Sequence, residues 1–487
     1  MKQVLVATAL AVCAVTKAQT VGVYYDSVQD GRLVGGRIEI DLQHPQHRQE
    51  YGVAGPLMRA GAWPVTTIRD HGPPSNRVDL VLIGDGYTSI NLTSFATHAN
   101  NVLLPFFAEE PFAAYATYFN VHRVDVLSNE SGVDQLDLKI FKDTALDMAY
   151  GCFGVDRALC INVSKALDAA ASAPEADQIL ALANSTRFGG AGYASADLGT
   201  VAGNSQSAVE IALHEFGHAF AGLADEYDYG AAGAYPGADP TQPNVTIYDA
   251  TVLLQTHWKW FEWLDLPHVD TFEGAAYYEE GIFRPTDNSK MRSLGRPFEE
   301  VNVQQLVMSI YELVSPVDDA TPAGTHFGCE PLFVTPLEPA DHDLTVQWFV
   351  DGVAVAGANA PVFVPAEVLP LGGAYTVGVE VIDETPRVRD EAFRSNWMRF
   401  GRSWRIESNI PAGDCRCSSA CADIYADGSI DLRDVGGFLS CFGGKSLASA
   451  GCVCADLNGD LEVNAADFAA LVKRLGKAPV FRYPDCD

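Results

Sequence analysis

The pattern of hydrophobic and polar positions divides the chain into segments of different character. Short alternating runs such as VGVYYDS, GRIEIDLQ and VTTIRD fill residues 19–75 and predict short strands joined by turns. The apolar run VDLVLIGDGYT then ends in glycines, and helical patterning follows over residues 89–118, where Pro105 and Pro111 mark breaks. FNVHRVDVLS reads as a further strand. A strand, a glycine loop and a helix in this order indicate an α/β domain, which we place at residues 76–316.

A buried helix is predicted to begin near Ser207. Ser207 and Glu210 have the spacing of a capping box, in which the two side chains satisfy the first free amides of a helix. Apolar residues cover most faces of this helix, so we expect it to be enclosed by other elements. Gly222 is a suitable stop, because glycine adopts the left-handed conformation that ends many helices.

The last part of the chain predicts two further domains. Residues 317–410 contain short alternating runs between turn signals, such as LTVQWFVDGVAVAG and AYTVGVEVIDET, and these indicate an immunoglobulin-like β-sandwich. Residues 411–487 contain an internal repeat. DIYADGSIDLRDVGGFLSCFG begins at Asp423 and DLNGDLEVNAADFAALVKRLG begins at Asp456, an offset of 33 residues. Each copy predicts a loop followed by a helix.

Charge and the N-terminal segment narrow the class of protein. Asp and Glu number 63 against 32 Lys and Arg, and the formal net charge of −31 argues against binding to nucleic acid. Residues 1–18 have a basic start at Lys2, a short apolar run and a small-residue end, which predict a signal peptide. No stretch is long and apolar enough for a transmembrane helix. We therefore expect a protein that is secreted or held at the cell surface; a lipoprotein signal ending at Cys13 is the alternative.

Cysteine usage fits an exported protein. The chain has 11 cysteines, and removal of Cys13 with the signal peptide leaves an even number, which suggests disulfides. Cys152 and Cys160 flank a short segment that a disulfide can close into a loop, and seven more follow residue 414. Reduced structural thiols are the alternative.

The segment HEFGHAFAGLADEY, residues 214–227, carries the strongest chemical signal. His214 and His218 lie one helical turn apart, so both imidazoles can face one zinc ion. Glu215 between them points away from the ligands and can act as general base on a water molecule. A buried helix with two hydrogen-bonded histidines is the structural alternative. It requires two imidazoles and a carboxylate to be buried without a cation, which is costly.

The third zinc ligand is less sharply defined. Asp225 follows Gly222 by three residues, as the third ligand follows a glycine in the metzincin pattern, although both lie one position further from the second histidine here. We expect Asp225 to bind the zinc. Glu226 or a distant carboxylate or histidine are the alternatives, in which case Asp225 would orient a histidine. Tyr227 and Tyr229 are candidates to stabilise the oxyanion of the reaction, or they pack beside the site.

The tail repeat resembles a pair of calcium loops, in which oxygen ligands occupy positions 1, 3, 5, 7, 9 and 12. The second copy offers Asp456, Asn458, Asp460, the Glu462 carbonyl, Asn464 and Asp467. The first copy offers Asp423, Asp427, the Ser429 carbonyl, Asp431 and Asp434. Leu461 replaces the usual glycine in the second loop, and Tyr425 replaces a ligand in the first. We expect structural calcium in this α-helical, dockerin-like EF-hand tail, with a possible docking partner; an acidic, disulfide-held tail without metal is the alternative.

Several segments together resemble the bacterial IgA-peptidase family of zinc metallopeptidases. They include HEFGHAFAGLADEYDYG, LIGDGYT, DTALDMAYG, ADQILALANSTRFGGAGY and RPTDNSKMRS, in the order expected for that family over roughly residues 78–310. The resemblance implies a zincin-type core with His214 and His218 as ligands and Glu215 as catalytic base. It also implies that Met291 forms a methionine turn beneath the metal; ordinary core packing is the alternative.

These observations favour a secreted zinc endopeptidase that acts on protein or peptide substrates. A non-catalytic surface or adhesion protein that keeps the fold is a second hypothesis, and Glu215 is the residue that discriminates against it. A subunit whose main role is calcium-dependent assembly through its tail is a third.

Overall fold

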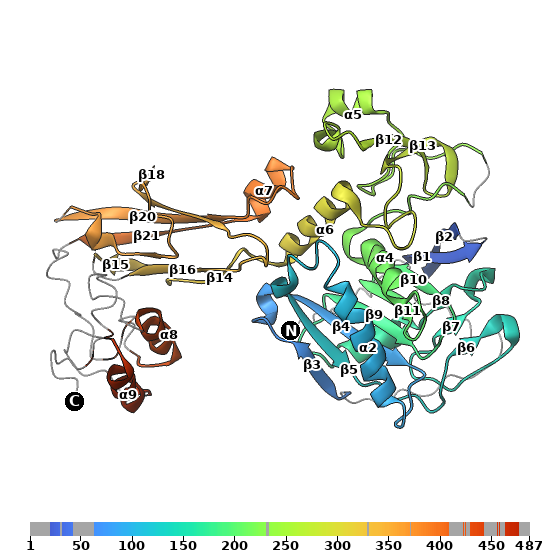
Figure 1. Ribbon diagram of the computed structural model, residues 1–487, viewed down its shortest axis with the longest axis horizontal. Helices are drawn as coiled ribbons and strands as arrows, with labels where there is room; N and C mark the ends of the chain where they lie inside the picture. The colour runs from blue at the N-terminus through green and yellow to red at the C-terminus, as the bar shows by residue number, and fades with distance from the viewer. Residues whose placement is uncertain are drawn as a thin grey trace, which may run out of the picture. The chain divides into compact units, whose positions relative to one another are not determined.

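The computed structural model describes two compact units, residues 1–313 and 314–487 (Figure 1). The described residues are 20–29, 32–41, 63–229, 233–328, 331–370, 372–408, 422, 424, 429–442, 455, 457 and 463–476. The predicted signal peptide therefore lies outside the described part of the chain. Among the described residues, no helix combines the length and the apolar character that a membrane span requires.

An eight-stranded mixed sheet forms the frame of the first unit, in the order β2-β1-β10-β11-β9-β4-β5-β3. Its strands are β1 (Thr20–Gln29), β2 (Arg32–Asp41), β3 (Val65–Arg69), β4 (Val78–Asp85), β5 (Phe119–Val124), β9 (Gln178–Ala183), β10 (Gly190–Tyr193) and β11 (Leu198–Ala202). The central pairs β11–β9, β9–β4 and β4–β5 are parallel, whereas β10, β1 and β2 pair antiparallel at one side. All eight residues of β4 are buried, which explains its unbroken apolar run.

Helices cover both faces of this sheet. They are α2 (Leu92–Phe106), α3 (Val163–Ala170) and α4 (Ala208–Ala221), and the unit also contains α5 (Ala250–Thr256) and α6 (Glu299–Leu313). Val81 and Ile83 of β4 share a core cluster with Val163 of α3, whereas Gly84 lies against Phe95 of α2. Because neighbouring strand residues face opposite ways, α2 and α3 pack on opposite faces. Helix α4 contacts α2, α6 and the strands β9, β10 and β11, and Figure 1 shows it lying along the latter two.

Smaller elements complete the first unit. The short strands β6 (Asp134–Gln135), β7 (Ala149–Tyr150) and β8 (Leu159–Cys160) form a three-stranded sheet, and β12 (Val269–Ala275) pairs with β13 (Tyr278–Thr286) as a hairpin. The short 3-10 helices are η1 (Pro74–Asn76), η2 (Ala116–Tyr118), η3 (Leu136–Leu138), η4 (Cys152–Gly154) and η5 (Phe261–Trp263). The predicted disulfide between Cys152 and Cys160 is confirmed.

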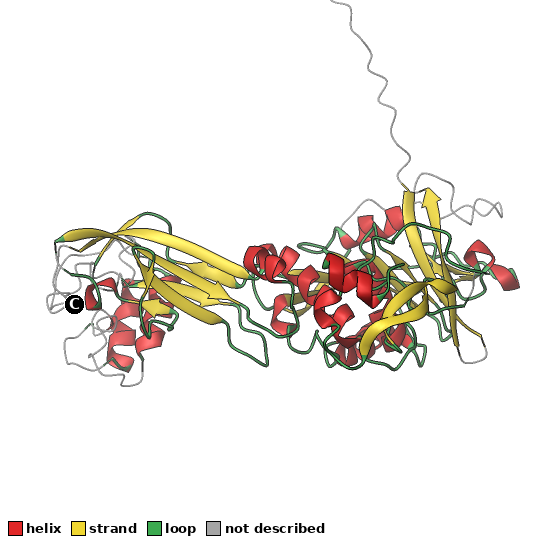
Figure 2. Ribbon diagram, turned by 90° about the horizontal axis from the view of Figure 1, so that it is seen from above, coloured by secondary structure: helices red, strands yellow, loops and turns green. Residues whose placement is uncertain are grey.

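The second unit begins with two sheets that share one hydrophobic core. One sheet has the order β14-β16-β19 and the other β15-β21-β20-β17-β18. The elements are β14 (Val317–Ala320), β15 (Thr325–Phe327), β16 (Leu332–Pro336), β17 (Thr345–Val350), β18 (Val353–Ala354), β19 (Val362–Phe363), η6 (Pro365–Glu367), β20 (Gly373–Ile382), α7 (Glu391–Trp397) and β21 (Arg399–Ser408). Val334, Trp348, Val379 and Trp404 contribute to the core from both sheets. Figure 2 shows that strands dominate this part of the chain.

The tail repeat is visible as two matching helices, α8 (Leu432–Cys441) and α9 (Ala465–Arg474). Each has a capping box, formed by Asp431 with Asp434 and by Asn464 with Asp467. Phe438 and Leu471 bury one face of each helix in a shared cluster. The immunoglobulin-like and dockerin-like assignments remain predictions.

One local expectation about helix α4 is wrong and another is confirmed. Ser207 precedes the helix but makes no side-chain capping hydrogen bond. Glu210 Oε2 instead accepts hydrogen bonds from Lys290 Nζ and from the Gly295 amide, both at 2.8 Å. The carboxylate that the capping box required is therefore bound by a segment distant in sequence. Gly222 ends the helix with φ 60°, as predicted.

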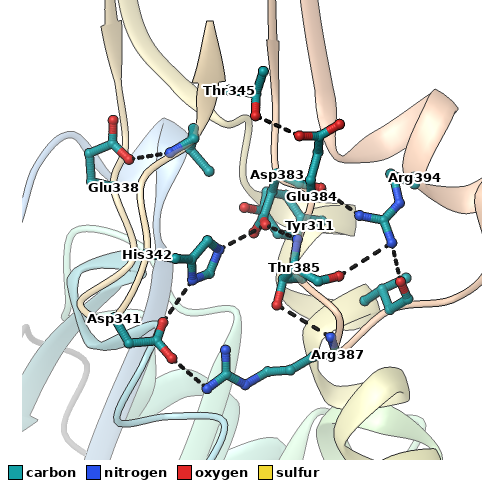
Figure 3. Close-up of polar contacts among 12 residues, drawn as sticks. Tyr311, Glu338, Asp341, His342, Thr345, Asp383, Glu384, Thr385, Arg387 and Arg394 are labelled. Carbon is teal, nitrogen blue, oxygen red and sulfur yellow. Dashed lines mark hydrogen bonds and ion pairs between the residues drawn. The ribbon is translucent and has the colours of Figure 1, made fainter.

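A polar cluster joins two loops in the second unit (Figure 3). His342 Nδ1 lies 2.7 Å from Asp341 Oδ1, and its Nε2 lies 2.8 Å from Oδ1 of the buried Asp383. Arg387 also pairs with Asp341, at 2.6 Å. Burial acts to lower the pKa of His342, but the hydrogen bonds and charges of the two aspartates outweigh burial and raise it.

We therefore predict that His342 makes the stability of the second unit depend on pH. Because its folded-state pKa is raised, its contribution is fully present below the unfolded value of about 6.5 and is lost as the pH rises through the folded value. The measurement is the free energy of unfolding of the wild type and of His342→Gln at several pH values. The difference between them should shrink as the pH rises from the acidic side; a difference independent of pH would contradict the expectation.

Candidate metal centre

Helix α4 places His214, Glu215 and His218 in the interior of the first unit. All three side chains are 0% exposed, because the helix packs between the sheet and the helices α2 and α6. The two histidines lie four residues apart and therefore project from the same face of the helix. Their rings lie 4.7 Å apart and nearly perpendicular, at 87°.

Main-chain carbonyl groups determine the tautomer of both histidines. His214 Nδ1 lies 3.0 Å from the Lys290 carbonyl oxygen, and His218 Nδ1 lies 2.7 Å from the Leu223 carbonyl oxygen. A carbonyl oxygen can only accept a hydrogen bond, so each Nδ1 must carry the proton and donate it. In the neutral rings, each Nε2 therefore presents a lone pair, which is the form in which histidine binds a metal.

Asp225 brings a third donor atom to the same point. Its Oδ1 lies 3.2 Å from His214 Nε2 and 3.3 Å from His218 Nε2, and the two Nε2 atoms lie 3.0 Å apart. Burial acts to raise the pKa of Asp225, but the positive charge and hydrogen bonds that the two rings can supply outweigh burial and lower it. These effects require the imidazoles to be protonated, and with neutral imidazoles a cation among the three atoms would favour the ionised carboxylate in their place.

These three atoms fit a zinc ion. Three lone pairs that converge at such distances repel one another unless a cation lies among them or the imidazoles are protonated. A tetrahedral zinc with bonds of about 2.0–2.2 Å requires its donor atoms to lie about 3.3–3.6 Å apart. The observed separations of 3.0–3.3 Å come close to this range. Two neutral imidazoles and one carboxylate are also a donor set that zinc prefers.

Glu226, the alternative third ligand, is turned away from this point. It is 0% exposed, and its Oε1 accepts from Asn244 Nδ2 at 3.0 Å and Asn302 Nδ2 at 2.8 Å. Its Oε2 accepts from Ser289 Oγ at 2.6 Å. Burial raises the pKa of Glu226, although these hydrogen bonds work against the rise. Glu226 thus joins three segments of the unit and does not face the two histidines.

Met291 lies directly against helix α4 beneath the histidines. A Cβ atom added to Gly217 would come within 2.8 Å of Met291 Sδ, so only glycine leaves room for the sulfur. The Met291 carbonyl oxygen also accepts from the Glu226 amide at 2.9 Å. Met291 therefore packs between the helix and the segment that carries Asp225, and its role as a methionine turn remains a prediction.

The Glu215 carboxylate lies against strand β10. A Cβ atom at Gly190 would come within 3.0 Å of Glu215 Oε1, and one at Gly192 within 3.0 Å of Oε2. Two glycines spaced by two residues on one strand thus make the space for this carboxylate. Gly190 and Gly192 lie within a segment that resembles the peptidase family, but their contact with Glu215 could not be predicted from spacing.

The sequence reasoning missed two tyrosines that contact the ligand residues. Tyr277 Oη donates to Asp225 Oδ2 at 2.5 Å, from a turn that lies 52 residues further along the chain. The Tyr24 ring of β1 stacks on the His218 ring at 4.4 Å with an angle of 8° between the planes. No local pattern in the sequence marks either residue, because both contacts depend on tertiary structure.

The two tyrosines that the sequence suggested as oxyanion donors stack on each other. The Tyr227 and Tyr229 rings lie 5.2 Å apart at 22°, and Tyr227 is 0% exposed. Tyr227 also contacts the Tyr277 ring at 5.3 Å. This arrangement is the packing role that we gave as the alternative for Tyr227.

The predicted calcium ligands are only partly described. Asp423, Asp427, Asp456, Asn458, Asp460 and Glu462 lie outside the described residues. Asp434 accepts from the amides of Ile424 at 2.6 Å and Asp431 at 2.8 Å. Asp467 accepts from Leu457 at 2.8 Å and Asn464 at 3.0 Å in the same way. Asp431 and Asn464 are the corresponding N-cap residues of α8 and α9, and Ser429 lies two residues before Asp431. Calcium binding remains a prediction.

Comparison with known proteins agrees with the site. No curated protein matches the chain. Residues 66–267 match the family described as IgA Peptidase M64, a segment that contains helix α4 and Asp225. Tyr277 and Met291 lie beyond the matched segment. Residues 66–267 are therefore identified as an IgA peptidase M64 domain within this chain.

Proposed function

We propose that the protein is a secreted, zinc-dependent endopeptidase that hydrolyses peptide bonds of proteins. Membership of the M64 family implies a metallopeptidase. The convergence of His214 Nε2, His218 Nε2 and Asp225 Oδ1 is the observation that carries the assignment of zinc. Secretion rests on the sequence of residues 1–18.

The three donor residues would hold the zinc, and the chain fixes each of them separately. The carbonyl groups of Lys290 and Leu223 orient the two imidazoles, and the contacts around Asp225 orient its carboxylate. A bound zinc supplies Lewis-acid chemistry, which polarises a peptide carbonyl and lowers the pKa of water. The three-residue donor set leaves a coordination position for water and substrate, as catalytic zinc sites require.

Glu215 is the residue that we propose as general base. Its carboxylate follows a ligand directly in sequence and is enclosed between α4 and β10. From there it can take a proton from the attacking water at a carboxylate oxygen and deliver it to the leaving amine. The low dielectric of an enclosed site strengthens this proton transfer and the stabilisation of the charge that develops.

Glu215 also argues against the second hypothesis, a surface or adhesion protein that has kept only the fold. Burying a carboxylate against two strand glycines costs stability, and a purely structural helix would gain from an apolar residue there. The third hypothesis, calcium-dependent assembly, draws on the repeat around α8 and α9. We keep calcium and a docking partner as proposals for the tail, beside the immunoglobulin-like assignment for residues 317–410, because neither competes with the peptidase site.

We predict that Glu215→Gln retains zinc and fold but loses activity by about 10²–10⁴-fold, the usual contribution of a general base. The measurement is kcat/KM on a peptide library, together with zinc content. Glu210→Gln is the matched control, because Glu210 lies on the same helix but pairs with Lys290 and Gly295 instead. Activity of Glu215→Gln close to that of the wild type would remove Glu215 from the mechanism.

A second prediction separates the two candidates for the third ligand. Asp225→Ala should lose zinc, because it removes the oxygen that faces both imidazoles. Glu226→Gln should keep zinc but lower the free energy of unfolding by about 1–3 kcal/mol, since an amide cannot accept at both ends of this buried network. Metal analysis and denaturant unfolding of the two variants provide the test. Loss of zinc from Glu226→Gln but not from Asp225→Ala would make Glu226 the ligand and Asp225 the structural residue.

A further inference from the structure

Asp225 lies on a segment that has no regular structure of its own. Residues 222–229 follow α4 and belong to neither a helix nor a strand. Neighbouring contacts hold this segment: Asn244 bonds to both the amide and the carbonyl group of Ala224, and the Glu226 amide donates to the Met291 carbonyl. These contacts fix the main chain on each side of Asp225 but do not orient its carboxylate.

The turn between β12 and β13 contacts the same segment. Ala276 and Tyr277 form its two central residues, with φ 47° and 78°. Glycine and asparagine are the usual residues in such a turn, because left-handed backbone costs other residues about 1–2 kcal/mol each. The Ala276 amide donates to the Asp225 carbonyl, and the Tyr277 amide donates to the Tyr227 carbonyl, each at 3.0 Å. Main-chain hydrogen bonds thus connect the strained turn to the segment that carries Asp225.

We infer that Tyr277 is a positioning residue for the metal centre. Its hydroxyl donates to Asp225 Oδ2 at 2.5 Å, while Asp225 Oδ1 faces the two histidines. A carboxylate held at one oxygen cannot rotate about its Cβ–Cγ bond, so the other oxygen stays directed at the metal. Tyr277 therefore preorganises the third ligand. This inference rests on the proposed zinc function.

Tyr277→Phe tests the role, because it removes only the hydroxyl group. Partners that orient metal ligands contribute about 10–100-fold to metal affinity, and we expect the dissociation constant for Zn²⁺ to rise by that factor. Tyr278→Phe is the matched control: Tyr278 is the next residue, and its ring packs on Tyr235 at 5.3 Å instead of contacting Asp225. Affinity is measured by competition with a chelating dye, and the thermal midpoint of the metal-free proteins is measured in parallel.

The outcomes separate the two claims. A zinc dissociation constant for Tyr277→Phe within about twofold of the wild-type value would overturn the positioning role. A lower thermal midpoint of metal-free Tyr277→Phe that accompanies its loss of zinc affinity would also overturn the positioning role. That result would show that the hydroxyl group stabilises the fold in general. Failure of the wild type itself to bind zinc would instead contradict the proposed function.

Strand β1 lies beside the buried metal site. His214, Glu215 and His218 are 0% exposed and Asp225 is 1% exposed, so a peptide cannot reach them unless an element moves. Strand β1 pairs with β10 at Val23–Tyr193, Tyr24–Gly192 and Tyr25–Ala191, directly beside the two glycines that face Glu215. The Tyr24 ring covers one face of His218, and its hydroxyl accepts from Gln242 Nε2 at 2.9 Å.

We propose that the hairpin of β1 and β2 is autoinhibitory. The stack of Tyr24 on His218 acts as a latch that holds the hairpin over the metal site and keeps substrate out. The hairpin is joined from Thr20–Asp41 to Gln29–Arg32, whereas three residue pairs join β1 to β10 in the part of the chain that the structure describes. Its separation from β10 as a unit breaks this short ladder, the ring stack on His218 and the hydrogen bond to Gln242, and it exposes Val23, which is buried in the core. Separation would uncover His218 and the edge of β10.

Tyr24→Ala tests the latch, with Tyr24→Phe as the matched control that keeps the ring. An aromatic stack of this kind shifts an opening equilibrium by about threefold to tenfold, and we expect kcat/KM on peptides to rise by that factor in Tyr24→Ala alone. Hydrogen exchange at the amides of residues 190–193 should rise with it. Faster exchange without a gain in activity would overturn autoinhibition, and unchanged exchange would overturn the latch. If no variant, nor the wild type, cleaves peptides, the proposed function fails instead.

Discussion

The structure of the site depends on one constraint: three donor atoms must meet at one point in the buried interior of the first unit. Carbonyl oxygens of Lys290 and Leu223 force the protons of His214 and His218 onto Nδ1. The two Nε2 lone pairs and the Asp225 carboxylate then face one another at 3.0–3.3 Å. The three groups repel one another unless a divalent cation binds between them. The rest of the first unit positions the residues that carry these groups.

The sheet and the loops contribute to the site in different ways. Strands β9, β10 and β11 support α4, which carries two proposed ligands and the proposed base in fixed relation to one another. Strand β10 adds the glycines that accept the Glu215 carboxylate. The third ligand comes from irregular chain and therefore needs support from distant segments, which Asn244, Met291 and the turn at Tyr277 provide.

The sequence predicted what local spacing determines. The four-residue separation of His214 and His218 identifies a shared helical face, and Gly222 predicts the helix end. Contacts between distant residues could not be predicted in this way. The expected partner of Ser207, Glu210, is bound by Lys290, which lies 80 residues away in the chain. Tyr24 and Tyr277 contact the proposed ligands through strand pairing and a turn. The buried network around Glu226 favours Asp225 as the third ligand.

Crystal diffraction recorded on both sides of the zinc absorption edge tests the central claim most directly. The account predicts one strong anomalous peak in the first unit, within bonding distance of His214 Nε2, His218 Nε2 and Asp225 Oδ1. A zinc-supplemented crystal with no peak at this point, or with the ion bound by Glu226 in place of Asp225, would contradict it.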